Sequence, residues 1–289
     1  MLKTMVALVA MSLVALAAPS ALPATLRPGD PAPVIAAERA FSARAAVVGI
    51  SPSFLENMAD DAIVFNPDPL LARAVYGGRP AGKTPKEGGT LLHWWPNFAG
   101  LARSGDLGFT TGPATVDGKP AGIFYFTVWS RQPDGGWKWV YDGGADADGA
   151  GAPGPEAAPT VLPLGDATPL PPAAAMDQVK AAEMALAAHA KVSGGASAYK
   201  AVLAGDARVQ GSGAAPATTP AAVDRELATR APSIAFGPLG GGASKAGDLA
   251  WTYGDARWDQ GRGHYVRIWQ RRAGKWALVF DQIIAAPKP

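Results

Sequence analysis

The sequence predicts an α+β fold built from two consecutive copies of one domain, each with helices first and a curved antiparallel sheet afterwards. The first observation is a repeat, because SGDLGFTTG at residues 104–112 returns as AGDLAWTYG at residues 246–254. The second is that, in both copies, a helix-period apolar pattern precedes segments whose apolar residues alternate with period two. Equivalent landmarks lie 139 to 145 residues apart, which is the length of a whole domain and too long for a solenoid repeat.

Each copy begins with an amphipathic helix. In the first copy Ala37, Phe41 and Ala45 share one face, which predicts a helix that starts near residue 36 and ends before Gly49. In the second copy the same pattern predicts a helix over residues 179–192.

Shorter helices and strands follow in the same order in both copies. The expected short helices lie at residues 54–59 and 199–204, an early strand at 62–65, and later strands at 107–111, 123–131 and 137–142. Thr84-Pro85-Lys86-Glu87 predicts a third helix, because threonine is a good N-cap, proline suits the first turn and glutamate completes a capping box. Thr219-Pro220 repeats that opening in the second copy. Glycine-containing turns between the later strands indicate an antiparallel meander.

The repeat also places the domain boundaries. We expect one domain over residues 31–142 and a second over residues 176–285. Residues 143–175 between them are rich in Gly, Pro and Ala. Such a stretch buries too little apolar surface to offset its ordering entropy, so a partly extended linker is expected. Its apolar part, Thr160 to Leu164, could dock on a neighbouring surface.

The N-terminus has the form of an export signal. Lys3 precedes an apolar run from Met5 to Ala18, which is followed by small residues and prolines. The run is too short to span a bilayer. We therefore interpret residues 1–24 as a signal peptide and expect a periplasmic or secreted protein without a stable membrane anchor. An uncleaved interfacial anchor is the alternative.

Composition excludes several kinds of site. The 289 residues include no cysteine, which excludes disulfides, thiolate metal sites and a cysteine nucleophile. The three histidines form no metal-binding motif, so neither a metal nor another cofactor is expected. The net charge is only +2 and the basic residues form no run, so a nucleic-acid partner is not expected.

The order helix, helix, strand, helix and meander resembles the nuclear transport factor 2-like superfamily. The motifs that carry the resemblance are ADDA at the first strand, GDLGFTTG on a middle strand and YFTVWSRQPDGGWKWVYD at the end. The sequence looks most like exported bacterial members of the SnoaL-like or ketosteroid-isomerase-like kind, over most of residues 36–142 and more weakly over residues 179–283. The resemblance implies two tandem cone-shaped domains, each with a cavity between a concave sheet and about three helices. It leaves the chemistry open, because the superfamily includes isomerases, dehydratases, cyclases, epoxide hydrolases and non-catalytic binders.

Aromatic residues of the predicted strands are the main candidates for ligand binding. Tyr125 and Trp129 recur as Tyr265 and Trp269, with Arg267 in the register of a threonine. Odd-numbered residues from 123 to 131 share one strand face and even-numbered ones the other, so one of these faces lines the implied cavity. The candidate ligand-binding residues are Trp94, Trp95, Tyr125, Trp129, Trp251, Tyr265, Arg267 and Trp269. Core packing is the alternative role for the recurring Tyr and Trp.

Catalysis, if present, is expected in the first copy alone. The resemblance implies a buried carboxylate, or a histidine with a carboxylate, as a general base. No histidine occurs in both copies, so His93 with Tyr125 or Asp142 is the candidate catalytic set. Asp142 recurs as Asp281, for which a strand-end cap is the alternative role. The equivalent Glu38 and Glu183 either point inward or lie on the helix surface.

Three functional hypotheses follow. The leading one is non-catalytic binding of a small, partly apolar molecule or of a partner. The second is a lyase, isomerase or hydrolase that acts on a small hydrophobic substrate in the first copy. The third is structural, with the two domains packed sheet to sheet as an internal pseudo-dimer that has no ligand.

Overall fold

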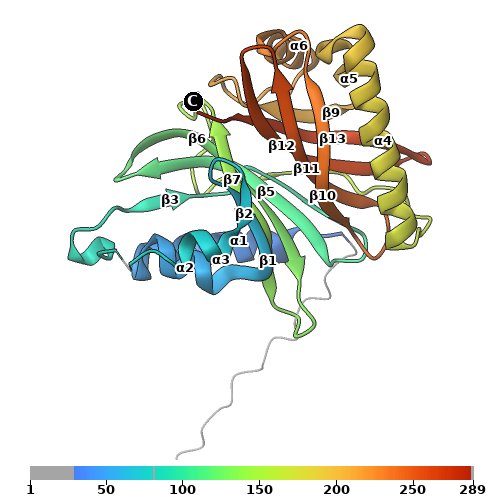
Figure 1. The fold of residues 1–289 in the computed structure, drawn as a ribbon. Helices are drawn as coiled ribbons and strands as arrows, with labels where there is room; N and C mark the ends of the chain where they lie inside the picture. The colour runs from blue at the N-terminus through green and yellow to red at the C-terminus, as the bar shows by residue number, and fades with distance from the viewer. Residues whose placement is uncertain (1–28, 81, 288–289) are drawn as a thin grey trace, which may run out of the picture.

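The computed structural model describes residues 29–80 and 82–287, and it shows two sheets packed back to back with helices on their outer sides (Figure 1). The first half contains α1 (Ala32–Val48), α2 (Ile50–Asn57), β1 (Met58–Phe65), β2 (Pro69–Leu71), α3 (Ala72–Tyr76), the 3-10 turn η1 (Pro85–Glu87), β3 (Leu92–Trp94), β4 (Phe98–Leu101), β5 (Leu107–Val116), β6 (Lys119–Arg131), β7 (Trp137–Asp146) and β8 (Thr160–Val161). The second half contains α4 (Pro172–Ser193), α5 (Gly195–Val202), β9 (Leu203–Gln210), α6 (Pro220–Thr229), β10 (Ala235–Ala243), β11 (Leu249–Trp258), β12 (Gly261–Arg272) and β13 (Lys275–Ala285). The expected signal peptide, residues 1–24, lies outside the described residues.

The two sheets share one strand order. The first runs β2-β1-β7-β6-β5-β4-β8, with β3 also paired to β5, and the second runs β10-β11-β12-β13-β9. Both are mixed sheets rather than the purely antiparallel ones expected, because β1 lies parallel to β7 and β9 lies parallel to β13. Each of these strands enters the sheet directly from a helix, so no hairpin fixes its direction against its neighbour.

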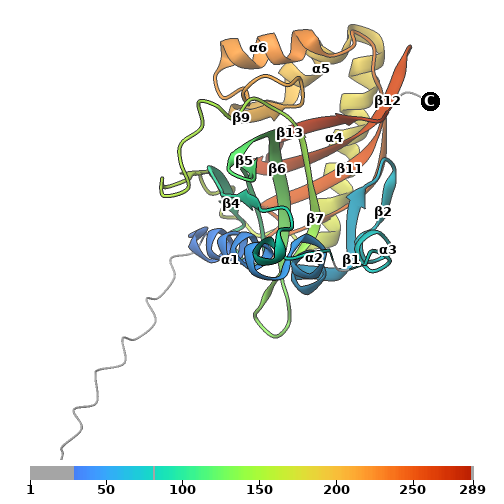
Figure 2. The same ribbon diagram turned by 90° about the vertical axis from the view of Figure 1, so that its left-hand side faces the viewer.

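The helix ends follow the predicted glycine signals. α1 ends at Gly49 and α4 at the equivalent Gly194, both with φ near +85° (87° and 84°), a backbone conformation that favours glycine. Turned by 90°, the molecule shows the first-half helices on one side of the sheets and α5 and α6 on the opposite side (Figure 2). No helix within residues 29–80 and 82–287 is both long and apolar enough to cross a membrane.

The third helix predicted in the first half does not form. The capping box of Thr84 and Glu87 is present, but the turn stops at Gly88, whose φ of 84° is left-handed. Consequently His93 lies on the strand β3, paired with Thr115 of β5, and not on a helix. In the second half Thr219-Pro220 does begin a helix, α6, because no glycine interrupts its first turns.

The repeated GDL turns hold the two halves together. Asp248 accepts a hydrogen bond from the amide of Arg103 at 3.0 Å, and Asp106 accepts one from the amide of Lys245 at 3.1 Å. Arg103 and Lys245 occupy equivalent positions of the repeat, as do the two aspartates. The contact is therefore reciprocal, as at a two-fold interface between identical subunits.

Aromatic side chains fill the space between the sheets. Phe126 of β6 stacks on Phe280 of β13, with ring centroids 4.0 Å apart and planes 8° apart. The buried cluster between the sheets consists of Phe98, Ala102, Leu107, Phe109, Phe126, Val128, Tyr141, Leu162, Leu249, Trp251, Val266, Ile268, Val279 and Phe280.

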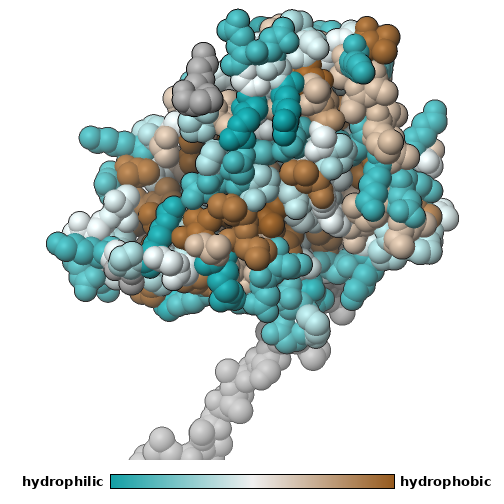
Figure 3. Space-filling view, viewed as in Figure 1, coloured by the Kyte–Doolittle hydropathy of each residue, from teal (hydrophilic) through white to brown (hydrophobic). Residues whose placement is uncertain are grey.

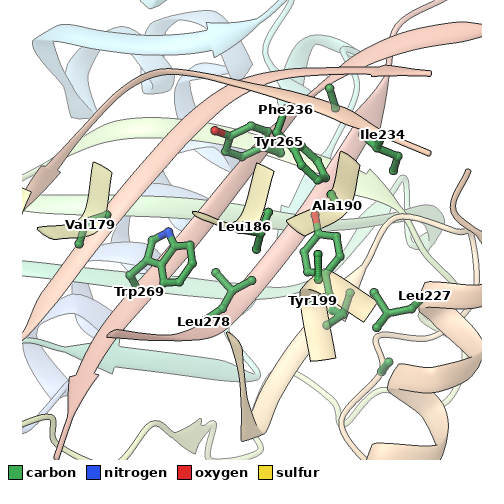
Figure 4. Close-up of a cluster of buried hydrophobic side chains, with 14 of the residues drawn as sticks. Val179, Leu186, Ala190, Tyr199, Leu227, Ile234, Phe236, Tyr265, Trp269 and Leu278 are labelled. Carbon is green, nitrogen blue, oxygen red and sulfur yellow. The ribbon is translucent and has the colours of Figure 1, made fainter. Parts of the chain in front are cut away.

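Each sheet has a further buried cluster between it and its helices. One packs Phe41 and Phe54 of the first half against Trp94, Trp129 and Trp139. The other packs α4 and α5 on the second sheet, with Leu186, Tyr199 and Trp269 among its members (Figure 4).

The segment that connects the halves is attached to both of them. β7 continues to Asp146, and α4 already begins at Pro172. The docking expected for residues 160–164 is confirmed, because β8 pairs in parallel with β4 and Leu162 is buried between the sheets.

Candidate functional site

The helix-facing side of the first sheet carries the candidate site. Tyr125 and Trp129 of β6 belong to the cluster under the helices, whereas Phe126 and Val128 belong to the cluster between the sheets. The odd-numbered residues of β6 therefore face the helices, a choice that the alternation of the sequence leaves open.

Three polar residues form a row across this face. Thr110 of β5 lies opposite Thr127 of β6, which lies opposite Asp142 of β7. The Thr127 hydroxyl donates a hydrogen bond of 2.8 Å to Asp142. Side chains opposite each other on adjacent strands are close neighbours, so the row is one continuous polar strip on an otherwise apolar face.

Glu38 of α1 lies above this row. It shares the buried helix face with Val34, Phe41 and Ala45, and none of its surface is exposed. Its carboxylate accepts hydrogen bonds from Trp94 Nε1 at 2.6 Å, from Trp129 Nε1 at 2.8 Å and from the Thr110 hydroxyl. Glu38 is thus an interior acceptor that orients both indoles.

The two carboxyl groups hold protons more tightly than exposed ones do. Burial raises the pKa of Glu38, and the hydrogen bonds that it accepts oppose that rise only in part. Burial, reinforced by the charge of Glu38, raises the pKa of Asp142 well above its usual range. Within the described residues no Lys or Arg forms an ion pair with either group. A protonated carboxyl at this place can donate a hydrogen bond.

The hydroxyl of Tyr125 is a buried hydrogen-bond donor. It makes no hydrogen bond of good geometry to the described residues, although the Thr110 hydroxyl lies near enough to lower its pKa slightly. Burial and the nearby charges of Glu38 and Asp142 raise the pKa of Tyr125 well above its usual value, so the phenol stays protonated. On the neighbouring strands Gly112 and Gly144 lie opposite Tyr125, and neither has a side chain to satisfy it. A buried, unsatisfied hydroxyl costs free energy that a bound acceptor would recover.

One end of this face is partly exposed. Tyr76 of α3, Ile123 and Asp142 all retain accessible surface. Burial, and after it the charge of Asp142, raises the pKa of Tyr76. An apolar patch covers the surface where β2 and α3 lie (Figure 3), and Leu70 and Leu71 are exposed there.

Other predicted residues lie elsewhere. His93 packs its ring against Trp95, at 5.4 Å, beside a separate pocket of about 150 Å³ that α1 and residues 155–156 also line. Neither the ion pairs nor the hydrogen bonds of the described residues join His93 to Asp142 or Tyr125. Trp251 lies between the two sheets, near Tyr141.

The second half contains the same arrangement with an arginine at its centre. Thr252, Arg267 and Asp281 form the equivalent row, under Glu183 of α4. Arg267 donates to Glu183, to Asp281 at 2.8 Å and to the hydroxyl of Tyr199 at 2.8 Å. The side chain of Arg267, at 0% exposure, therefore occupies the middle of the second site.

The equivalent aspartates of the two halves therefore differ in whether an arginine neutralises their charge. Burial alone would raise the pKa of Asp281, but Arg230 and Arg267 outweigh it and hold that pKa below the usual value. The predicted residues Tyr265 and Trp269 both donate to Glu183, at 3.1 and 2.8 Å. They are internal partners of a satisfied ionic network.

The raised pKa of Asp142 has a consequence for stability. A carboxyl whose pKa is higher in the folded chain binds more protons there, so stability falls as pH rises from about 4 through the folded pKa. Each unit of such a shift corresponds to about 1.4 kcal/mol. We expect Asp142→Asn to melt at a higher temperature than the unmodified protein above pH 6, with little difference at pH 4. Asp177→Asn, at an exposed position of α4, is the control, and equal pH profiles for all three proteins would contradict the assignment.

Comparisons with known proteins concern the fold. No family model and no curated protein matches the chain. Similar solved structures include a nuclear transport factor 2-like protein of unknown function from Pseudomonas putida, with 16% identity, a TM-score of 0.32, and coverage of 39% of this chain and 88% of that one. A ketosteroid isomerase-like protein from Erwinia carotovora has 13% identity, a TM-score of 0.33, and coverage of 38% and 96%. This chain is similar to nuclear transport factor 2-like proteins.

A third match covers a similar share of this chain. A nuclear transport factor 2-like protein from Cytophaga hutchinsonii has 15% identity, a TM-score of 0.30, and coverage of 38% of this chain and 98% of that one. At such identities the likeness concerns the fold alone. The residues described from 29 to 287 contain no group of three or more His, Asp or Glu side chains that could hold a metal ion.

Proposed function

We propose that the protein binds a small, uncharged, partly apolar molecule on the helix-facing side of the first sheet. The observation that carries this proposal is the buried Tyr125 hydroxyl, which makes no hydrogen bond of good geometry among the described residues. It lies beside two carboxyl groups that have raised pKa values and that pair with no Lys or Arg in the described part of the chain. A ligand oxygen such as a carbonyl would accept from Tyr125 and from protonated Asp142. The aromatic rings of Trp94 and Tyr76 would contact its apolar part, and an anionic ligand would be repelled.

The second half serves as a structural counterpart in this proposal. Arg267 fills the place that the ligand takes in the first half, and Ile283 stands where the first half has Gly144. The shared strand order and the matching polar rows support two tandem cone-shaped domains, residues 31–142 and 176–285, that arose from one. Export to the periplasm or beyond rests on the sequence of residues 1–24 alone.

A thermal-shift screen of small carbonyl compounds tests the binding proposal. At least one compound is expected to raise the melting temperature by several degrees, which corresponds to roughly 2–3 kcal/mol at 100 times its Kd. Tyr125→Phe is expected to abolish the shift. Tyr265→Phe, the matched change in the second half, is expected to retain it. A shift that survives Tyr125→Phe, or none across the screen, would contradict the proposal.

A proton-transfer enzyme in the first half is the second candidate. The favouring observation is Asp142 itself, a partly exposed carboxyl with a raised pKa on the same sheet face as Tyr125, which suits a general acid. For an isomerase or lyase, Asp142→Asn would abolish turnover while it retains binding. His93→Ala would leave turnover unchanged, because that ring lies against Trp95.

A further inference from the structure

In the first half, an extended segment covers the groove between α1 and β4. Residues 153–164, called here the covering segment, cross α1 and then run along the edge of the sheet. Arg39 of α1 donates to the carbonyls of Pro155 and Ala157 at 3.3 and 3.4 Å. The covering segment then forms β8, where the amide of Thr160 donates to the carbonyl of Asn97, just before β4, and the amide of Leu162 donates to that of Ala99 in β4, at 2.9 Å each.

The equivalent groove of the second half has no such cover. β10 is the edge strand of the second sheet, and within the described part of the chain no strand pairs with its outer side. A cavity of about 510 Å³ lies between α4 and β10, and Met176, Lys180, Met184, Leu239, Gly241 and Thr252 are among the residues that line it. Met184 is 68% exposed and Leu239 53% exposed.

Strand register shows that the two grooves correspond. Ala99 of β4 lies opposite Thr110, and Gly241 of β10 lies opposite the equivalent Thr252. The carbonyl of Ala99 is the one that accepts from Leu162 of the covering segment. Gly241 therefore presents its backbone at the position where the first sheet receives β8.

We propose that the groove between α4 and β10 binds an extended, mostly apolar peptide segment of a partner protein, which adds a short parallel strand to β10. An open strand edge offers unpaired backbone groups to such a segment. Pro238 lacks an amide donor, which limits pairing to the neighbourhood of residues 239–243. The occupant resembles the covering segment in kind, with β-branched or leucine residues next to prolines.

The walls of the groove suit that chemistry. Met176 and Met184 are flexible apolar side chains that adapt to different apolar partners. Lys180, which is exposed at the rim, can donate to peptide carbonyls as Arg39 does in the first half.

A synthetic peptide with the sequence of residues 153–164, PGPEAAPTVLPL, is the probe. We expect it to bind the full chain in a fluorescence anisotropy titration and to slow amide exchange at residues 239–243 at least tenfold. Leu239→Glu is expected to weaken binding at least tenfold. Val192 lies on α4 at an 86% exposed position outside the groove lining, so Val192→Glu is expected to leave peptide binding unchanged.

Two further variants make the test decisive. A peptide with Leu162→Asp is expected to lose binding at least tenfold, because the residue equivalent to the buried leucine carries a charge. Loss of binding in Arg39→Ala with no effect of Leu239→Glu would mean that the peptide displaces the covering segment, and would overturn the proposal. Absence of binding at millimolar peptide, or occupation of the groove by a small apolar dye alone, would overturn it equally.

Discussion

Replacement of Arg267 by methionine is expected to destabilise the protein by roughly 3–5 kcal/mol, although methionine matches much of the volume. Arg267 is fully buried and is hydrogen-bonded to Glu183 and Asp281, neither of which is exposed. Without it Asp281 keeps Arg230, at 2.6 Å, whereas Glu183 has no other ion-pair partner among the described residues. A buried charge that loses its partner carries its full desolvation cost.

The pH dependence distinguishes this loss from a simple packing defect. The lowered pKa of Asp281 means that its stabilisation is present above about pH 4 and is lost as pH falls through the folded pKa. The deficit of Arg267→Met should therefore shrink in acid, where Asp281 becomes protonated. Urea unfolding at pH 7 and at a pH well below 4 measures it. Arg272→Met is the control, because Arg272 lies on the same strand as Arg267 and forms a partly exposed ion pair with Asp206 of β9. It is expected to cost less than about 1 kcal/mol. A pH-independent deficit would refute the electrostatic explanation.

Phe280→Ala is expected to cost about 3–5 kcal/mol, because it leaves a cavity between the two sheets. The ring is fully buried and stacked on Phe126, so little of the surrounding structure can collapse into the space. Urea unfolding of Phe280→Ala, Phe126→Ala and the double variant measures both the cost and the coupling. The coupling energy is expected to be about 0.5–1.5 kcal/mol.

The exposed Leu71→Ala supplies the control for this series and is expected to change stability by less than about 0.5 kcal/mol. If the halves depend on each other through this cluster, Phe280→Ala also lowers the stability of the first half. Separate transitions with an unchanged first half would contradict that dependence.

Much of the local structure was predictable from the residues. Gly49 marks the end of α1, and the alternation along residues 123–131 defines the two faces of β6. These features depend on backbone sterics and on side-chain period, which are local properties. The third helix was predicted wrongly, because a good capping box cannot propagate a helix through Gly88 and Gly89.

Glu38, the central residue of the site, was not among the predicted site residues. Glu38 looks like an ordinary surface glutamate, yet it lies among Val34, Phe41 and Ala45 on the buried stripe. The available signal was its recurrence as Glu183, together with the threonine shared by the two GDL motifs, Thr110 and Thr252. Those residues meet only because α1 crosses the sheet above β5.

The sequence by itself determined that one pattern of helices and strands occurs twice, because periodicity and turn chemistry are written in neighbouring residues. Only the tertiary structure decided that equivalent carboxyl groups have opposite environments. Asp142 faces Glu38 without a cation, and Asp281 faces Arg267, because a pKa depends on which side chains from distant strands share a low-dielectric interior.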